Sequence, residues 1–82
     1  MRVKVLYFAS LREALGLAGE ELELPAAVNT VAALREHLLA QGRTALATAR
    51  NLRCAVDQEM ARPATPLCEG CEVAFFPPVT GG

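Results

Sequence analysis

The sequence predicts an α+β fold in which a mixed sheet of four or five strands packs on one long helix. Three observations support this fold class: alternating apolar segments lie near both ends of the chain, one strong helical segment lies between them, and 82 residues suffice for a single domain only. We predict that residues 1–78 form the domain and that residues 79–82 form a flexible tail.

The first strand is predicted at residues 2–8, where apolar and other side chains alternate. Val3, Val5 and Tyr7 share one face, and the opposite face begins charged and ends apolar. A short helix should follow at once, because Ser10 and Glu13 have the spacing of a capping box. Gly16 or Gly19 would end that helix.

Residues 21–24 alternate again before Pro25, which predicts a second strand antiparallel to the first. The long helix is predicted from the segment TVAALREHLLAQG, with Thr30 or Asn29 as its cap and Gly42 as its end. Its apolar stripe consists of Val31, Leu34 and Leu38. Residues 43–50 could form a helical turn or a loop.

A third strand is predicted at residues 52–56, with Cys54 in the core, a turn at 57–59 and a short edge strand at 60–62. The last strand is predicted at residues 72–76, with Val73 and Phe75 facing the helix. This order of elements is typical of the β-grasp, or ubiquitin-like, roll. In that roll the first and last strands lie side by side at the centre of the sheet.

Several apolar side chains should then lie on the face of the sheet that no helix covers. They are Leu6, Phe8, Met60 and Phe76. A contiguous apolar patch on a small domain indicates a partner-binding surface, whereas scattered surface hydrophobes would need no explanation.

The chain continues from this patch as PPVTGG. Pro77 and Pro78 predict an extended exit from the sheet, and Val79, Thr80 and Gly81 would continue the tail into a partner's active site. The reactive group would be the α-carboxylate of Gly82. Activated as an acyl adenylate it is an electrophile, and converted to a thiocarboxylate it is a sulfur nucleophile.

Composition and charge exclude several other function classes. A net charge of −1 gives no basic surface for nucleic acid or anionic lipid, and no apolar run approaches the roughly 20 residues that span a bilayer. The N-terminal segment lacks the continuous apolar core of a signal peptide, so we expect a cytoplasmic protein. The three cysteines fit reduced thiols better than disulfides.

The remaining polar candidates indicate no active site of their own. Cys68 and Cys71 form a C-x-x-C spacing, but zinc needs four ligands, and we expect ordinary turn thiols and no metal. A redox or opportunistic metal role for the pair is the alternative. His37 is expected on the helix surface. The carboxylates at positions 20, 21 and 23 are expected on the solvated face of a strand.

Three segments together resemble the MoaD family, the small sulfur-carrier subunits of molybdopterin synthase. They are VKVLYFASLRE, TVAALREHL and EVAFFPPVTGG, and their order covers nearly the whole chain. The resemblance implies that an E1-like adenylyltransferase activates Gly82 with ATP, and that sulfur transfer then yields a thiocarboxylate. It also implies docking through Phe8, Met60 and Phe76.

The same resemblance implies which partner the chain binds and which of the two subunits carries the catalytic residues. The tail would enter the large subunit of molybdopterin synthase, in a heterotetramer of two small and two large subunits. There the thiocarboxylate would sulfurate cyclic pyranopterin monophosphate to build the dithiolene of the molybdenum cofactor. The catalytic residues would belong to the large subunit, and the small subunit would bind no cofactor. The sulfur donor stays open.

Two other functions could use the same C-terminus. A ubiquitin-like modifier would form isopeptide bonds with lysines of many proteins, and a thiamine-type carrier would deliver sulfur to another pathway. Carriers of the thiamine type are usually shorter and lack the FFPPVTGG ending, which favours the molybdopterin interpretation.

Overall fold

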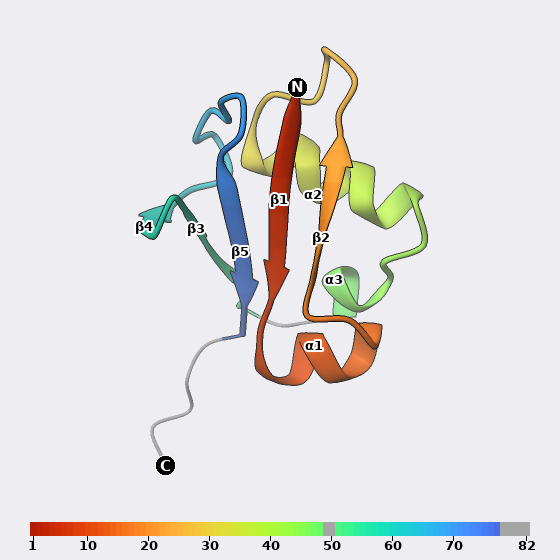
Figure 1. Ribbon diagram of the computed structural model, residues 1–82. Helices are drawn as coiled ribbons and strands as arrows, with labels where there is room; N and C mark the ends of the chain where they lie inside the picture. The colour runs from red at the N-terminus through yellow and green to blue at the C-terminus, as the bar shows by residue number, and fades with distance from the viewer. Residues whose placement is uncertain (49–50, 78–82) are drawn as a thin grey trace.

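Three helices and five strands make up the domain in the computed structural model, which describes residues 1–48 and 51–77. The strands form a single mixed sheet in the order β2-β1-β5-β3-β4. Figure 1 shows α2 crossing behind this sheet, with α1 at the end where β1 stops. The elements are β1 (Arg2–Tyr7), α1 (Ala9–Leu15), β2 (Gly19–Glu23), α2 (Val31–Ala40), α3 (Ala45–Thr48), β3 (Arg53–Val56), β4 (Glu59–Ala61) and β5 (Glu72–Phe76). The predicted fold class is confirmed.

The first and last strands lie side by side, as predicted. β1 is parallel to β5, with Leu6 opposite Ala74, and β5 is antiparallel to β3, with Phe76 opposite Arg53. β2 and β4 are the outer strands of the sheet. Because side chains of aligned residues point to the same face, this register decides which residues share each surface.

The inner face of the sheet and the helices enclose the core. Its members include the predicted strand residues Val3, Val5, Tyr7, Val73 and Phe75, the helix residues Val31, Leu34 and Leu38, and Cys54. All of these side chains are at most 7% exposed. The apolar positions that were predicted to face the core therefore do so.

The long helix begins and ends close to its predicted residues. The Thr30 hydroxyl accepts a hydrogen bond from the Ala33 amide at 3.2 Å, which satisfies one of the unpaired amides at the helix start. α2 ends at Ala40, and Gly42 takes a left-handed φ of 97° just beyond it. The ambiguous segment after it contains the single turn α3.

The predicted cap of the first helix is wrong. α1 begins at Ala9, one residue before Ser10, and no side chain caps it. Pairing with β5 continues through the Phe8 amide, which donates to the Phe75 carbonyl at 3.2 Å, and the Phe8 carbonyl then accepts from the Leu11 amide at 3.1 Å. Strand pairing and burial of Leu11 therefore set the helix start, and they hold Ala9 at a left-handed φ of 53°.

Two element boundaries differ from those predicted. β2 begins at Gly19, two residues before the predicted start, and the turn after β3 contains only residues 57 and 58. Gly16 ends α1 in a left-handed conformation, so Gly19 is free to pair with β1. Within the described residues, no helix has the length and apolar character to cross a membrane.

Candidate functional site

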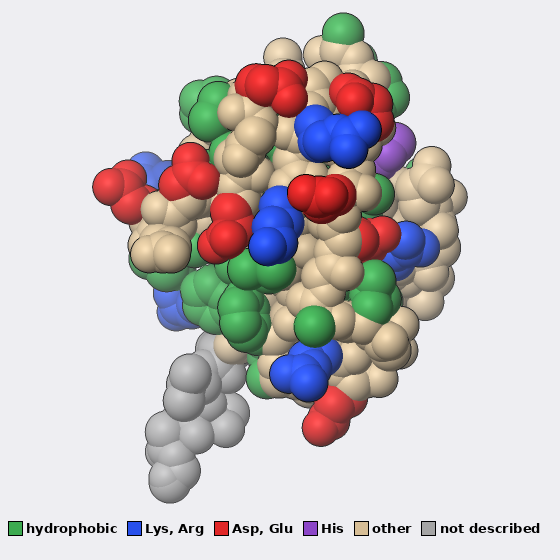
Figure 2. All heavy atoms as spheres, in the orientation of Figure 1, with side chains coloured by type: hydrophobic (Ala, Val, Ile, Leu, Met, Phe, Trp, Pro, Cys, Tyr) green, Lys and Arg blue, Asp and Glu red, His purple; other side chains and the backbone are tan. Residues whose placement is uncertain are grey.

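The outer face of the sheet carries two adjoining rows of apolar side chains near the end of β5. One row crosses four strands through the aligned residues Leu6, Ala74, Ala55 and Met60. The neighbouring row contains Phe76, with Phe8 at the exit of β1. Figure 2 shows a continuous hydrophobic area on the lower part of the face turned toward the viewer.

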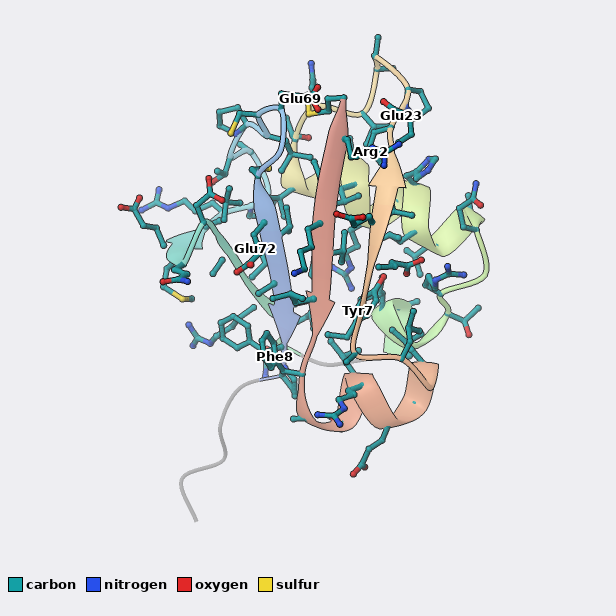
Figure 3. All side chains as sticks on the ribbon, viewed as in Figure 1. Arg2, Tyr7, Phe8, Glu23, Glu69 and Glu72 are labelled. Carbon is teal, nitrogen blue, oxygen red and sulfur yellow. The ribbon has the colours of Figure 1, made fainter. Side chains whose placement is uncertain are left out.

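The structure thus brings together the four residues singled out in the sequence. We call Leu6, Phe8, Met60 and Phe76 the docking patch. Phe8 is 46% exposed and Met60 is 63% exposed, and they are the two exposed large hydrophobic side chains among the described residues. Leu6 and Phe76 are half-buried. In Figure 3 the Phe8 side chain lies beside the lower end of β5.

Gly19 on β2 allows the Leu6 side chain to lie close to the neighbouring strand. A Cβ atom on Gly19 would lie 2.7 Å from the Val5 carbonyl oxygen and 2.9 Å from Leu6 Cδ2. Both distances are shorter than real contacts, so β2 can approach β1 here only because the side chain is absent.

The other end of the outer face is charged and mostly acidic. Glu21, Glu23 and Glu72 occupy outward positions with Arg2 and Lys4 between them, and Asp57 adjoins Glu72. Asp57 accepts a hydrogen bond from the Glu72 amide at 2.9 Å, and Arg2 lies 3.7 Å from Glu23. Figure 2 shows most of the acidic and basic side chains of this face on its upper part, reaching down to the edge of the hydrophobic area.

Arg53 lies beside the docking patch and was not singled out in the sequence. It is exposed, and its backbone pairs with that of Phe76 at the point where β5 ends. The signal that could have found it is the alternation of residues 52–56, because inward Cys54 places Arg53 on the outer face.

On the opposite face, a hydrogen-bonded group joins β1, β2 and the segment after α2. Arg43 donates two hydrogen bonds to the Glu20 carboxylate, at 2.6 and 2.9 Å, and the Tyr7 hydroxyl donates a third at 2.7 Å. The expectation of a solvated Glu20 is therefore wrong, since its side chain is 15% exposed. The distant Arg43 is the partner that local spacing could not show.

The environment shifts the pKa values of this group in the directions that stabilise it. Hydrogen bonding from Arg43 holds the pKa of the Glu20 carboxyl below its ordinary value, despite the opposing effect of burial. Burial raises the pKa of the Tyr7 phenol, and the hydrogen bond to Glu20 raises it further. The group is thus an ionised pair with a neutral phenol at neutral pH.

The residues predicted to form the tail lie mostly outside the described part of the chain. Pro77 is half-buried directly after β5. Pro78, Val79, Thr80, Gly81 and Gly82 are not described, so their predicted roles stay predictions. The predicted domain boundary after residue 78 also lies outside the described residues and stays a prediction.

Cys54 lies in the core, as predicted, and Cys68 and Cys71 flank the predicted turn, but Cys71 is also buried in the core while Cys68 is exposed. Cys54 is buried, and the Cys71 amide donates to the Cys68 carbonyl at 3.1 Å across the Glu69-Gly70 turn. Burial raises the pKa of both the Cys54 and Cys71 thiols, which disfavours reactive thiolates there. Across residues 1–48 and 51–77, no group of three or more His, Cys, Asp or Glu side chains could hold a metal ion.

His37 is half-buried on α2, and within the described ranges its ring makes no hydrogen bond or ion pair. A pocket of about 530 Å³ is lined by α2 residues, including Arg35 and Glu36, together with Cys54 and residues of β4. No nucleophile hydrogen-bonds a base in that pocket among the described residues.

Two proteins of known name are similar in sequence to this chain over nearly its full length. The chain is 49% identical to the molybdopterin synthase sulfur carrier subunit of Escherichia coli K12 over 98% of its own length and 99% of the relative. It is 42% identical to the Haemophilus influenzae protein of the same name, with the same shares covered.

Solved structures share the fold along the whole chain. A putative molybdopterin converting factor subunit 1 from Pyrococcus furiosus matches with a TM-score of 0.78 and 29% identity, over 96% of this chain and 99% of that one. The complex of subunits 1 and 2 of the molybdopterin-converting factor from Helicobacter pylori contains a match with a TM-score of 0.70 over 100% of both chains. At 22% identity, that match shows the fold alone.

A family profile described as the ThiS family matches residues 5–82, which is nearly the whole sequence. Together with the two full-length relatives, this match shows that the chain belongs to the ThiS family and groups with its molybdopterin synthase sulfur carrier subunits.

Proposed function

We propose that this chain is the sulfur-carrier subunit of a molybdopterin synthase. The observation that carries the proposal is the 49% identity, over essentially the full length of both chains, to the Escherichia coli subunit of that name. The exposed apolar docking patch beside the end of β5 supports it, because a carrier must bind its partners through a surface near its reactive end.

The proposed reagent is the carboxyl terminus at Gly82. A carboxylate is a poor electrophile, so an activating enzyme first joins it to the AMP part of ATP and releases pyrophosphate. A sulfur nucleophile then displaces AMP, and the product after transfer is a thiocarboxylate with one sulfur in place of one oxygen. Glycine has no Cβ, so the enzymes that handle this terminus can approach its backbone closely.

The chain is proposed to act with partners and to bind no cofactor itself. ATP would be consumed in the active site of an E1-like adenylyltransferase. The thiocarboxylate would then attack the pterin precursor, cyclic pyranopterin monophosphate, inside the large synthase subunit. Two carriers acting in turn would supply the two sulfurs of the dithiolene, in an assembly of two small and two large subunits.

The geometry fits this division of labour. The docking patch would hold the domain against the large subunit, while residues 78–82, if extended, could reach about 17 Å beyond Pro77. The catalytic acid–base groups would come from the large subunit.

Intact mass spectrometry of the protein after reaction with its activating enzyme, ATP and a sulfur source tests the proposal. We expect the mass change of one oxygen replaced by sulfur, located by fragmentation at Gly82, and restoration of molybdopterin formation when the large subunit is added. A variant lacking Gly82 should fold normally and fail in both assays. If that variant still supports molybdopterin formation, the proposal is wrong.

The same mass measurement, repeated in cell extract, separates the other functions. A ubiquitin-like modifier would appear covalently attached to lysines of many proteins, and a carrier of another sulfur pathway would acquire sulfur yet fail with the large subunit. Either result would replace the molybdopterin assignment.

A further inference from the structure

The outer face of the sheet is positively charged at one end, because of Arg53, and negatively charged at the other. It lies beside Phe76 at the end of β5, where the chain leaves the sheet. At the other end of the same face lie Glu21, Glu23, Glu72 and Asp57, with Arg2 and Lys4. The Glu69 carboxylate, which accepts from the Arg2 amide, and the Met1 ammonium, 3.4 Å from Glu23, belong to the same end. Five carboxylates against three cations leave that end negative by two charges.

The two ends are far enough apart to act separately. Phe76 lies four positions after Glu72 on β5, which corresponds to about 13 Å at the usual rise of a strand. That distance exceeds the Debye length of about 8 Å at physiological ionic strength. A partner surface therefore meets a positive end, an apolar centre and a negative end as distinct regions.

The positive charge of Arg53 has no partner of opposite charge inside the domain. Within the described residues its guanidinium makes no hydrogen bond and no ion pair. By contrast, Arg2 lies 3.7 Å from Glu23, and Arg43 is paired with Glu20. An exposed arginine in water needs no partner, but the same group covered by a docked protein does.

We propose that the large synthase subunit presents a carboxylate to Arg53 and basic side chains to the acidic end of this face, so that charge fixes the orientation of docking. The inference rests on the proposed function and adds the chemistry of the partner surface. Apolar contacts through the docking patch supply burial, but they are nearly non-directional. Because the face is positive at one end and negative at the other, a complementary partner surface fits in one orientation and is repelled in the reverse orientation.

Arg53 lies where the C-terminal tail leaves the sheet, so a docking orientation set by Arg53 would also set where the tail begins. Arg53 and Phe76 are cross-strand neighbours, separated by about 5 Å between backbones. A guanidinium that forms two parallel hydrogen bonds with a carboxylate would fix the point from which the tail departs. The tail would then enter the partner's active site from a defined place.

Binding measurements with the large subunit test the proposal, using two matched neutralisations on one face. Arg53→Gln removes the unpaired cation beside the patch, and Lys4→Gln removes a cation from the acidic end. We expect Arg53→Gln to weaken binding at least about tenfold and to reduce its salt dependence. Lys4→Gln should leave the affinity unchanged or raise it, although the change in charge is the same.

Two further variants make the test decisive. Arg53→Leu extends the apolar patch, so equal or tighter binding by this variant would overturn the carboxylate partner. Arg53→Glu should bind very weakly, and a Lys substitution at one carboxylate of the large subunit should restore its binding. Failure of every such charge exchange would also overturn the inference.

The outcome for the unchanged protein separates this inference from the proposed function. If the unchanged chain does not bind the large subunit at all, the proposed function is wrong and the inference falls with it. If the unchanged chain binds and forms molybdopterin while Arg53→Leu binds at least as well, the inference alone is overturned.

Discussion

Single residues in left-handed backbone conformations define the hairpin that presents Met60. Asp57 and Gln58 have φ values of 49° and 69°, and Val56 pairs with Glu59 around them. Two consecutive positive φ values are those of a type I′ turn, in which glycine is strongly preferred at the second position. Gln58 therefore holds a conformation that its side chain disfavours.

Replacing Gln58 by glycine should stabilise the protein. Relief of the left-handed conformation is worth about 1–2 kcal/mol, and the greater freedom of glycine in the unfolded chain offsets about half of that. We expect the free energy of unfolding in urea to rise by about 0.5–1 kcal/mol. Glu59→Gly, one residue later in β4, is the control and should lower it, and a Gln58→Gly variant less stable than the parent would contradict the assignment.

Glu20 is the residue through which acid should weaken the fold. Its pKa lies below the ordinary value in the folded protein, mainly because Arg43 hydrogen-bonds the carboxylate. A depressed folded-state pKa adds stability that is fully present above the unfolded value of about 4.3 and is lost as the pH falls through the folded value. The loss therefore belongs to the acidic range and not to neutral pH.

Glu20→Gln should remove this pH dependence. At neutral pH we expect the variant to be less stable by about 1–3 kcal/mol, because hydrogen bonds to a charged group are replaced by weaker ones. As the pH falls below about 4, the two proteins should converge in stability. Urea unfolding at a series of pH values measures the difference, and parallel curves throughout the acidic range would show that Glu20 is not the group responsible.

At the scale of the elements, the approach of β2 to β1 depends on one missing side chain. A Cβ at Gly19 would come within 2.9 Å of Leu6 Cδ2 and within 2.7 Å of the Val5 carbonyl. The flexible Leu6 side chain could move, but the carbonyl is part of the strand pairing. β2 would have to shift away from β1 at this end.

Gly19→Ala should therefore disturb both the sheet and the docking patch. We expect a loss of about 1–3 kcal/mol in stability, typical of overpacking, together with amide chemical-shift changes at Leu6 and Phe8. Ala18→Gly, the neighbouring substitution on the same connection, is the control and should leave the Leu6 resonances in place. Unchanged Leu6 resonances in Gly19→Ala would show that the strand accommodates the side chain.

At the scale of the whole molecule, the adjacent residues Phe75 and Phe76 lie on opposite faces of the sheet, one in the core and one in the docking patch. Phe75 is 2% exposed in the core, whereas Phe76 is half-buried in the docking patch on the other face. The alternation of β5 separates the two rings by the thickness of the sheet. Stability and partner binding should therefore respond separately to the two substitutions.

Phe75→Ala should lower the free energy of unfolding by about 3–5 kcal/mol, as expected for a core aromatic. Phe76→Ala should cost much less stability and should weaken binding to the large subunit, since aromatic side chains supply much of the energy of interfaces. Thermal unfolding and calorimetric titration measure the two effects. Equal losses of stability from both variants would place Phe76 in the core and contradict the docking patch.

Local pattern predicted most of the elements and the orientation of their side chains. The alternation in β1 and β5 and the stripe of Val31, Leu34 and Leu38 are set by the repeat of strand and helix, so neighbours in sequence suffice to read them. The Thr30 cap could be read in the same way, because its partner is three residues away. The patch residues could also be assigned to a face by alternation alone.

Only the tertiary structure decided which distant residues meet. The start of α1 at Ala9 depends on pairing between Phe8 and Phe75, and the burial of Glu20 depends on Arg43, 23 residues away. The placement of Arg53 beside Phe76 follows from the register of β3 on β5. The sequence by itself determined the elements, their faces and the resemblance of the FFPPVTGG ending, since these rest on short-range geometry. The charge polarity of the docking face required the sheet order, because contacts between strands far apart in sequence leave no local pattern.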